Sequence, residues 1–315
     1  MILGIDGGGT KTTAALFETD GTFLSQAEAG SINTHSNALL YARRNLQIIM
    51  DSLRADVGKR TIRSAFIGSS ALNSVADEDT IRALTSGSLD AEMIGMDSDL
   101  AIALESMRCD EPCAVAICGT GSMAVGRDAG GLLHCKGGYG YLLGDEGSGY
   151  AISVDAIRAG LRSADGSARR TKLEETLFDF FQVSDTNALI DLVYDKPLRR
   201  QDLAAFLPVV AECADSGDET ACEILRMQAQ SFADTVKALL EYLPPDCPIG
   251  LWGGVFCHVP YFTACFKECI SGHTIGLLPY PPQIGAVFAA FRQCGIRLTD
   301  EVLQRIQSSY PNQDV

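Results

Sequence analysis

The sequence predicts an α/β protein built from two lobes, and three observations support this. Short apolar strand patterns alternate with amphipathic helical patterns along the chain. A strand pattern ends in a Gly/Thr turn twice, at residues 6–12 and 118–122, and each turn is followed by a strand, a tight turn and another strand. This shared order, with little residue identity, indicates an internal duplication. Residues 172–243 are almost wholly helical in pattern, which makes the C-terminal lobe helix-rich.

Length and composition agree with two domains. A chain of 315 residues with 46% apolar content can bury two sizeable cores. We expect the lobes at residues 1–112 and 113–295, with the final helical segment 296–315 as a candidate to complete the first lobe. The net charge of −15 argues against a nucleic acid or membrane partner. Eleven cysteines without a CxxC pair, and no signal peptide or membrane-spanning stretch, predict reduced thiols in a cytoplasmic protein.

The first block begins with a buried-strand pattern at residues 2–5, which stops at the turn Asp6-Gly7-Gly8-Gly9-Thr10-Lys11-Thr12. Strand patterns at 13–18 and 23–29 flank Thr19-Asp20-Gly21, a hairpin signal. The glycine turn therefore joins two strands. A Walker A loop is excluded, because it requires a following helix and a lysine at the position of Thr10.

The rest of the first lobe alternates between helices and strands. A polar loop at residues 30–35 precedes a helix over 36–55. The patterns that follow predict a strand at 63–68, a helix at 77–86, a strand at 91–95 and a short helix ending at Met107. Asp97-Ser98-Asp99 stands at the start of that last helix, where either aspartate could serve as its N-cap.

The stretch from 114 to 150 is the densest in glycine. An apolar run at 114–117 ends in Gly119-Thr120-Gly121-Ser122, and Gly144-Asp145-Glu146-Gly147-Ser148 comes just before a helical pattern over 147–163. Glycine weakens regular elements, but it lets backbone N–H groups face an anion. A nucleotide site is the first hypothesis. A dinucleotide-binding loop is disfavoured, because residues 123–127 alternate as a strand where that motif requires a helix.

The last part of the chain continues the alternation. A long helix from about 218 to 243 precedes a strand at 248–252, which ends in Gly253-Gly254. A helix at 260–270, a strand at 275–278 and helices at 285–294 and 299–309 complete the pattern. Three residues at helical spacing, Cys265, Cys269 and His273, resemble a metal stripe, but this spacing is more typical of a core face.

With these motifs in order, the chain resembles the BadF/BadG/BcrA/BcrD ATPase family, and within it the N-acetylglucosamine kinases of the sugar kinase, Hsp70 and actin fold. Residues 3–12 are similar to its first phosphate motif, 118–122 to the second and 251–256 to the adenosine motif. Gly138-Tyr139-Gly140 and residues 144–148 are similar to the sugar kinase branch in particular. The resemblance implies two actin-like (ribonuclease H-like) lobes with ATP in a central cleft.

The resemblance also implies which residues bind ATP and Mg²⁺. Asp6 would hold Mg²⁺, directly or through water; by itself it could also cap its own turn. The nucleotide would be contacted by Gly8, Gly9, Thr10, Lys11, Thr12, Gly119, Thr120, Gly121, Gly253, Gly254 and Gly285. Lys11 alone could equally be a solvated surface residue.

The acceptor implied by the resemblance is a small amino sugar. Asp99, in the pattern Asp-x-x-x-Ala, would be the catalytic base, and Asp97 is its competitor. The sugar would be contacted by Asn33, Asp99, Ser122, Gly138, Tyr139 and Asp145. Asn33 could instead form only an Asx turn. Tyr139 and Met123 stand where these kinases usually carry Trp and often Asn. N-acetylglucosamine, glucosamine, N-acetylmannosamine and N-acetylmuramic acid therefore all stay open.

Two other functions stay open as well. Some relatives in the family activate a dehydratase or reductase through an iron–sulfur cluster held by a cysteine before the second glycine loop, close to the place of Cys118. A sugar sensor without turnover is the third candidate. The sequence does not set the oligomeric state, for which a homodimer is one candidate.

Overall fold

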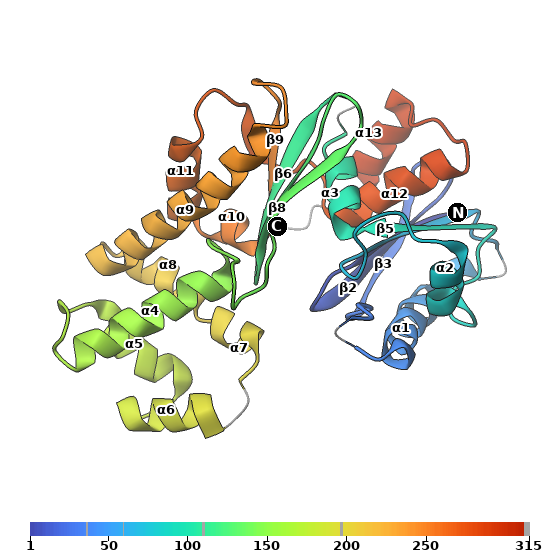
Figure 1. The fold of residues 1–315 in the computed structure, drawn as a ribbon. Coiled ribbons are helices and arrows are strands. Elements are labelled where there is room, and N and C mark those ends of the chain that lie inside the picture. The colour runs from blue at the N-terminus through green and yellow to red at the C-terminus, as the bar shows by residue number, and fades with distance from the viewer. Residues whose placement is uncertain (36, 59, 109–110, 196–197, 312–315) are drawn as a thin grey trace. The chain divides into compact units, whose positions relative to one another are not determined.

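The computed structural model describes residues 1–35, 37–58, 60–108, 111–195 and 198–311. The chain folds into two compact units (Figure 1), and each is described by itself. The first comprises residues 1–108 and 278–311, and the second comprises residues 111–277. No helix of the described chain combines the length and the apolar character needed to cross a bilayer.

The first unit is built on a five-stranded mixed sheet in the order β3-β2-β1-β4-β5. Its strands are β1 (Ile2–Gly7), β2 (Lys11–Phe17), β3 (Phe23–Gly30), β4 (Ser64–Ser69) and β5 (Met93–Ser98). The first three form an antiparallel meander, and β1, β4 and β5 run parallel. The glycine turn does join two antiparallel strands, as the sequence predicts.

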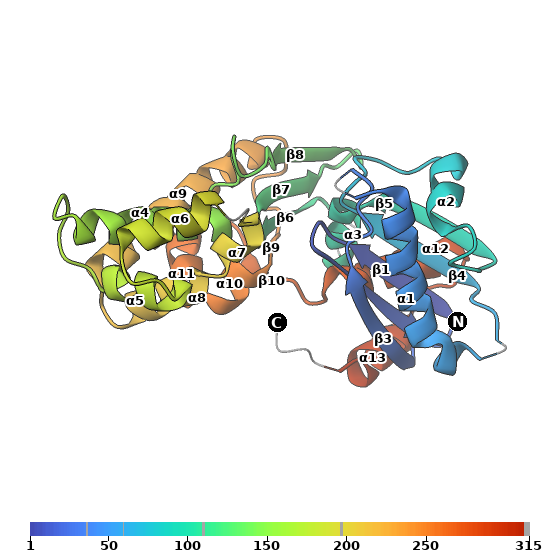
Figure 2. The same ribbon diagram turned by 90° about the horizontal axis from the view of Figure 1, so that it is seen from below.

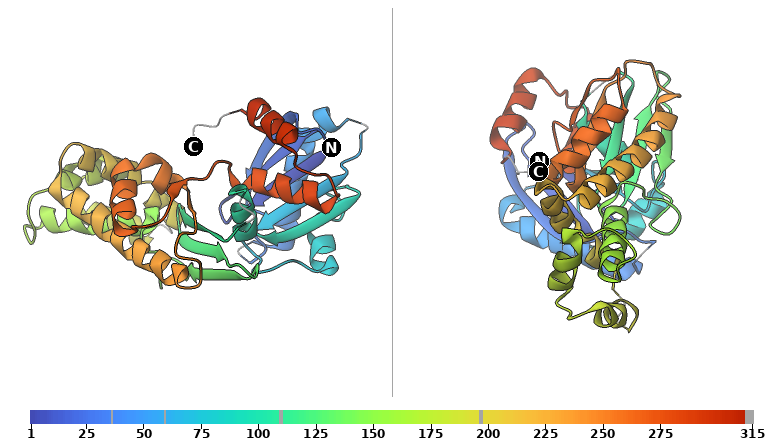
Figure 3. Two further views of the ribbon diagram at one scale, coloured as in Figure 1. Left: turned by 90° about the horizontal axis from the view of Figure 1, so that it is seen from above. Right: turned by 90° about the vertical axis from the view of Figure 1, so that its left-hand side faces the viewer.

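Helices cover both faces of this sheet. They are α1 (Leu39–Val57), α2 (Glu78–Thr85), α3 (Asp99–Ser106), α12 (Pro282–Gln293) and α13 (Asp300–Ser309). Alternate residues of β1 point to opposite faces: Leu3 and Ile5 join the core beneath α1, whereas Ile2 joins the core beneath α12. Figure 2 shows α1 along the strands, and Figure 3 shows α12 and α13 in red beside the blue strands.

The boundary of the second unit differs from the expected one. The sequence reading places residues up to 295 in the second lobe, but the structure ends that unit at Leu277. The difference lies in α12, whose Ile284, Val287 and Phe291 are fully buried against the first sheet. A pattern of helix and strand does not specify which of two sheets a terminal helix will cover.

The second unit repeats the design with the sheet order β10-β9-β6-β7-β8. Its strands are β6 (Cys113–Cys118), β7 (Ser122–Arg127), β8 (Leu133–Gly137), β9 (Ile249–Trp252) and β10 (Ile275–Leu277). Again the first three form an antiparallel meander, and the others pair in parallel. The duplication read from two glycine turns is therefore a duplication of sheet topology.

Most helices of the second unit come from the region that the sequence identifies as helix-rich. They are α4 (Gly149–Ala164), α5 (Lys172–Phe181), α6 (Thr186–Asp195), α7 (Arg200–Ala204), α8 (Leu207–Asp215) and α9 (Glu219–Leu240), followed by α10 (Gly254–His258) and α11 (Pro260–Cys269). Their apolar faces form one core with β6 and β9, in which Phe206, Phe232 and Phe262 are buried. The predicted α/β class with two lobes and a helix-rich second lobe is confirmed.

Candidate active site

Two carboxyl groups of the first unit, those of Asp6 and Asp99, have raised pKa values. Asp6 is near the carboxyl end of β1, and Asp99 is the first residue of α3, directly after β5. Burial, and then the charge of Asp99, raises the pKa of Asp6 to about 7. Burial raises the pKa of Asp99 to about 6. Carboxyl groups with perturbed pKa values are typical of functional sites.

The local sequence places Asp99 at this position. We expected the preceding strand to end at 95, but β5 stays paired with β4 as far as Ser98. The Ser98 hydroxyl then accepts a hydrogen bond from the N–H of Ala101 (3.1 Å) and caps α3. The cap is therefore neither aspartate. Asp97, the competitor for the role of base, accepts a hydrogen bond from the adjacent N–H of Ser98 at 2.6 Å.

The first glycine turn is open at its tip. A Cβ on Gly9 would meet no atom within 4 Å, and one on Gly8 would meet only the Lys11 carbonyl oxygen at 3.2 Å. Gly9, Thr10 and Lys11 are exposed. The Lys11 ammonium pairs with Glu28 at 2.8 Å on the surface, an exposed ion pair that contributes little and is easily exchanged.

Thr12 has a different position from its neighbours in the turn. It is fully buried, and its hydroxyl donates to the Gly30 carbonyl oxygen (3.0 Å) and accepts from the Ile32 N–H (3.2 Å). The Ser31 hydroxyl donates to the Gly8 carbonyl oxygen at 2.7 Å. The Thr12 side chain therefore ties the loop of residues 30–33 to the glycine turn.

Asn33 lies at the end of that loop and is 8% exposed. Its Oδ1 accepts a hydrogen bond from the His35 N–H at 2.8 Å, and its Nδ2 donates to the Ser70 hydroxyl at 2.9 Å. The first bond is the Asx turn that the sequence left as the alternative. The structure thus shows a local role for this amide, and its contact with a sugar stays a prediction.

In the second unit, hydrogen bonds join the second glycine loop to residues 144–149. The Gly149 N–H donates to the Gly119 carbonyl oxygen (2.7 Å), and the Ser122 hydroxyl donates to that of Glu146 (2.7 Å). The Cys118 thiol donates to the Gly147 carbonyl oxygen at 2.8 Å. These two motifs, about 25 residues apart in the sequence, therefore form one rigid segment of the site.

Asp145 is the buried acid of this segment. Its side chain is 4% exposed, and its backbone is in the left-handed region at φ 62°, which is unusual for a residue with a Cβ. Burial raises the pKa of the Asp145 carboxyl, although the Arg200 guanidinium and the N–H groups of Ser122 and Gly140 act in the opposite direction. Glycine at position 121 leaves room for the Asp145 carboxylate, because a Cβ there would lie 2.8 Å from the Asp145 Oδ2.

The glycine-aromatic segment lies beside the same loop. The Gly138 N–H donates to the Ser122 carbonyl oxygen at 3.1 Å, and Gly138 takes a positive φ of 71°. Tyr139 is 69% exposed. In this structure its ring is free to meet a ligand. Ser148 is instead the N-cap of α4 and accepts from the Ala151 N–H at 3.1 Å.

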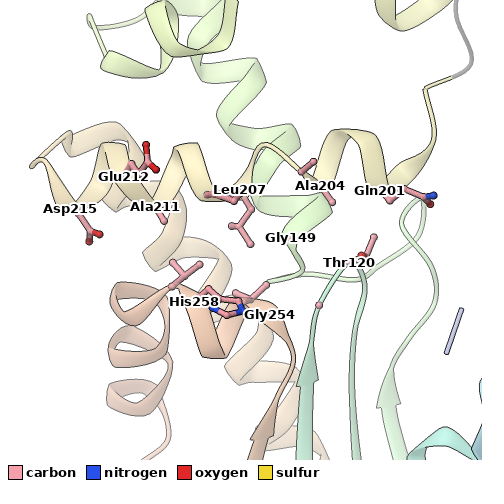
Figure 4. A pocket seen from close by; sticks show the side chains of 15 residues that line it. Thr120, Gly149, Gln201, Ala204, Leu207, Ala211, Glu212, Asp215, Gly254 and His258 are labelled. Atoms are coloured by element: carbon pink, nitrogen blue, oxygen red, sulfur yellow. The ribbon is translucent and has the colours of Figure 1, made fainter. Parts of the chain in front are cut away.

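A pocket of about 590 Å³ opens next to this loop within the second unit. Figure 4 shows Thr120 and Asp215 at its opposite ends, with Leu207 and Ala211 of α8 facing Gly254 and His258 of α10. Its wall is mainly apolar, with Gln201, Glu212, Asp215 and His258 as polar groups. A cavity of this size and character suits a nucleoside.

Gly253 allows the adenosine motif to reach this pocket. Its φ is 106°, and a Cβ would lie 2.4 Å from the Cys118 carbonyl oxygen, so β9 can end directly beside β6 only with glycine there. Gly254, the next residue, lines the pocket. The sequence does not indicate that residues of α7 and α8 line a pocket, because a helical pattern without a motif carries no functional signal.

Gly285 has a packing role in the first unit. A Cβ on it would lie 1.9 Å from the Ile102 carbonyl oxygen and 2.5 Å from the Ser106 hydroxyl, so α12 and α3 cross in direct backbone contact. Since α3 begins with Asp99, this contact fixes the helix that carries the proposed base. The nucleotide contact of Gly285 stays a prediction.

The cysteines show no metal centre in the described parts of the chain. No three His, Cys, Asp or Glu side chains there are grouped to hold a metal. Cys118 is fully buried, and burial raises the pKa of its thiol well above the usual range. In this structure Cys118 is a core residue at the end of β6, and its thiol donates to the Gly147 carbonyl oxygen.

Comparison with known proteins agrees with this geometry. The family model of the BadF/BadG/BcrA/BcrD ATPase family matches residues 3–291. The chain is 31% identical to the N-acetylmuramic acid/N-acetylglucosamine kinase of Clostridium acetobutylicum, over 86% of this chain and 90% of that protein. It is 30% identical to the N-acetyl-D-glucosamine kinase of Dictyostelium discoideum, over 78% and 81% respectively.

A solved structure shares the fold. The crystal structure of a candidate N-acetylglucosamine kinase from Porphyromonas gingivalis superposes with a TM-score of 0.75. It is 21% identical, and the match covers 93% of this chain and 99% of that one. At this identity the likeness concerns the fold.

Proposed function

The chain belongs to the BadF/BadG/BcrA/BcrD ATPase family and is an ATP-dependent sugar kinase, and we propose that its acceptor is an N-acetylated amino sugar, N-acetylglucosamine or N-acetylmuramic acid. Two relatives at 30% identity or more that carry these names support the acceptor. A cytoplasmic location and a homodimeric assembly stay predictions.

In the proposed reaction Asp99 accepts the proton of the sugar hydroxyl that attacks the γ-phosphate. The carboxyl must be ionised for this, and a pKa near 6 leaves it ionised at neutral pH and yet more basic than an ordinary aspartate. Phosphoryl transfer depends otherwise on position and charge neutralisation. The proposed contacts of the ATP phosphates are Gly8, Gly9, Thr10, Gly119, Thr120 and Gly121.

The residues present fit a magnesium ion beside Asp6. Its carboxyl and that of Asp99 repel each other, and a divalent cation would relieve that repulsion. Mg²⁺ needs only one or two protein carboxylates, because water and substrate phosphates complete its shell. When bound with ATP, the ion would neutralise charge on the transferring phosphoryl group. Asp6 would hold it, directly or through water.

The proposed sugar contacts are Asp145, Tyr139 and Asn33. Asp145 has a buried carboxylate, which is an acceptor for sugar hydroxyls, and Tyr139 has an exposed ring. Asn33 would add an amide from the first unit. Adenosine would occupy the pocket between α8 and α10, where Gly254 allows close approach. The one observation that carries the proposal is that the charge of Asp99 acts on Asp6, which directly precedes the open glycine turn.

A coupled assay of ADP release tests the proposal. We expect wild-type protein with ATP and Mg²⁺ to release ADP when N-acetylglucosamine or N-acetylmuramic acid is added. Asp99→Asn should lower kcat by roughly 10²- to 10⁴-fold, because the proton acceptor is removed. Asp97→Asn is the matched control and should keep its rate, since among the residues that the structure describes the Asp97 carboxylate bonds only to the adjacent Ser98 N–H. No sugar-dependent ADP release in wild type, or full activity in Asp99→Asn, would contradict the proposal.

A further inference from the structure

Arg200 is a cation at the proposed sugar site that no sequence motif marks. It is the first residue of α7, and its Nη1 lies 3.7 Å from the Asp145 Oδ2. Its side chain is 34% exposed, whereas that of Asp145 is 4% exposed. Gln201, the next residue, lines the nucleoside pocket. Arg200 therefore stands at the mouth of the site, between the buried acid and solvent.

The contact with Asp145 leaves most N–H donors of the Arg200 guanidinium without a hydrogen-bond acceptor among the described residues. A separation of 3.7 Å is an ion pair and is longer than a hydrogen bond. It is the one interaction of this side chain with the described residues. A guanidinium carries five N–H donors in a planar fork. Most of these donors therefore stay available to a ligand bound at Asp145.

The chemistry of an anionic sugar explains why a cation would stand here. The protein carries a net charge of −15, and Asp145 itself would repel an anion. A sugar that carries a carboxylate could bind only where a local cation offsets this repulsion. A planar guanidinium matches a carboxylate in a bidentate geometry. A hydroxyl bound to Asp145 would bring the substituent of a neighbouring ring carbon within reach of Arg200.

We propose that Arg200 recognises a carboxylate on the acceptor sugar, so that this kinase accepts a carboxylate-bearing N-acetylated amino sugar, of which N-acetylmuramic acid is an example, as well as a neutral one. This inference rests on the proposed function and makes Arg200 a determinant of specificity. Arg200 is distinct from Asp99, which acts on the attacking hydroxyl of either sugar.

The test compares kcat/KM for N-acetylmuramic acid and N-acetylglucosamine, each at saturating ATP, in wild type, Arg200→Gln and Arg200→Lys. Arg200→Gln should lower the ratio of the two values by roughly tenfold to one hundredfold, the range for one charge-assisted contact. Arg200→Lys keeps the charge without the fork and should restore the ratio in part. Arg199→Gln is the matched control, because the Arg199 guanidinium pairs with Asp202 and should leave the ratio unchanged.

Other outcomes identify other roles. An equal loss for both sugars would mean that Arg200 only positions Asp145, and a raised KM for ATP with both sugars would mean that it binds phosphate. Either result overturns the inference. If wild type phosphorylates N-acetylglucosamine alone, the inference fails and the proposed function stands; if it phosphorylates neither, the proposed function fails.

A measurement on the wild type covers the case in which Arg200→Gln does not fold. At one fixed ionic strength, kcat/KM should be higher for N-acetylmuramic acid than for its methyl ester, because the ester keeps the bulk of the substituent but removes the charge that pairs with a guanidinium. Equal values for the acid and the ester would overturn the inference.

Discussion

Asp6 and Asp99 have raised pKa values because folding removes much of the water around both carboxyls, and the charge of Asp99 raises the pKa of Asp6 further. The two groups differ in what they can do. Asp99 begins a helix whose cap is supplied by Ser98, so its own carboxylate is not needed for capping. Asp6 lies near the end of a buried strand, next to the open turn. These positions suit Asp99 to the proposed role of proton acceptor and Asp6 to the proposed role of cation ligand.

The raised pKa of Asp99 predicts how activity depends on pH. The base must be ionised, so kcat/KM should fall about tenfold per pH unit below a pKa near 6. A pH profile of ADP release with the same sugar measures this. Asp97→Asn should leave the limb in place. An acid limb near pH 4 would show that the group titrated is an ordinary, solvated carboxyl.

At the scale of elements, the second unit brings two strand ends and a loop to one place. The end of β6 carries the glycine loop, and the end of β9 carries Gly253, which lies against the Cys118 carbonyl oxygen. Residues 144–149 are joined to the end of β6 by hydrogen bonds to Gly119 and Cys118. Helix α9 adds Gln228, whose Oε1 accepts from the Gly147 N–H at 2.7 Å and whose Nε2 donates to Asp155 at 2.6 Å. The loop that carries Asp145 is therefore held from both sides.

Gly253→Ala tests this arrangement of elements. The new Cβ would overlap the Cys118 carbonyl oxygen at 2.4 Å, and the positive φ is strained for any other residue. We expect a loss of roughly 3 kcal/mol or more in the free energy of unfolding, measured by denaturant titration. Gly254→Ala is the control: its Cβ would meet only His258, at 3.7 Å, so stability should be retained. Wild-type stability in Gly253→Ala would contradict the close approach.

At the scale of the whole molecule, the chain leaves the first unit and returns to it. Residues 278–311 rejoin a unit begun by residues 1–108, and α12 buries Ile284, Val287 and Phe291 against its sheet. The C-terminal helices are therefore part of the unit that carries Asp6 and Asp99. The second unit has its own core and keeps the second glycine loop and Asp145 together.

This connectivity predicts that a mutation in α12 will destabilise strands far away in the sequence more than the neighbouring helix α11. Phe291→Ala should destabilise the first unit by about 3–5 kcal/mol, because it leaves a cavity beneath α12. Hydrogen exchange should then show lost protection in β1 and β4, and much less change in α11, although α11 is nearer in sequence. Phe262→Ala, a matched change in the other core, should give the reverse result. Lost protection in α11 alone after Phe291→Ala would contradict the division.

The sequence by itself determined the secondary-structure elements and their order, which depend on local chemistry. Strand and helix periods, hairpin turns and glycine positions predicted the elements and the repeated meander, because side-chain alternation and backbone freedom are properties of a few neighbouring residues. They also indicated Asp6, Asp99 and Asp145 as functional groups, through the resemblance of the motifs around them.

Only the tertiary structure decided which distant residues share a site. It placed α12 on the first sheet, gave the Thr12 hydroxyl an internal role, and brought Glu212, His258 and Arg200 to a site whose motifs lie elsewhere in the sequence. The physical reason is that burial, pKa and ion pairing depend on neighbours in space. Residues on a helix without a motif acquire a function only when packing sets them against a loop far away in the chain.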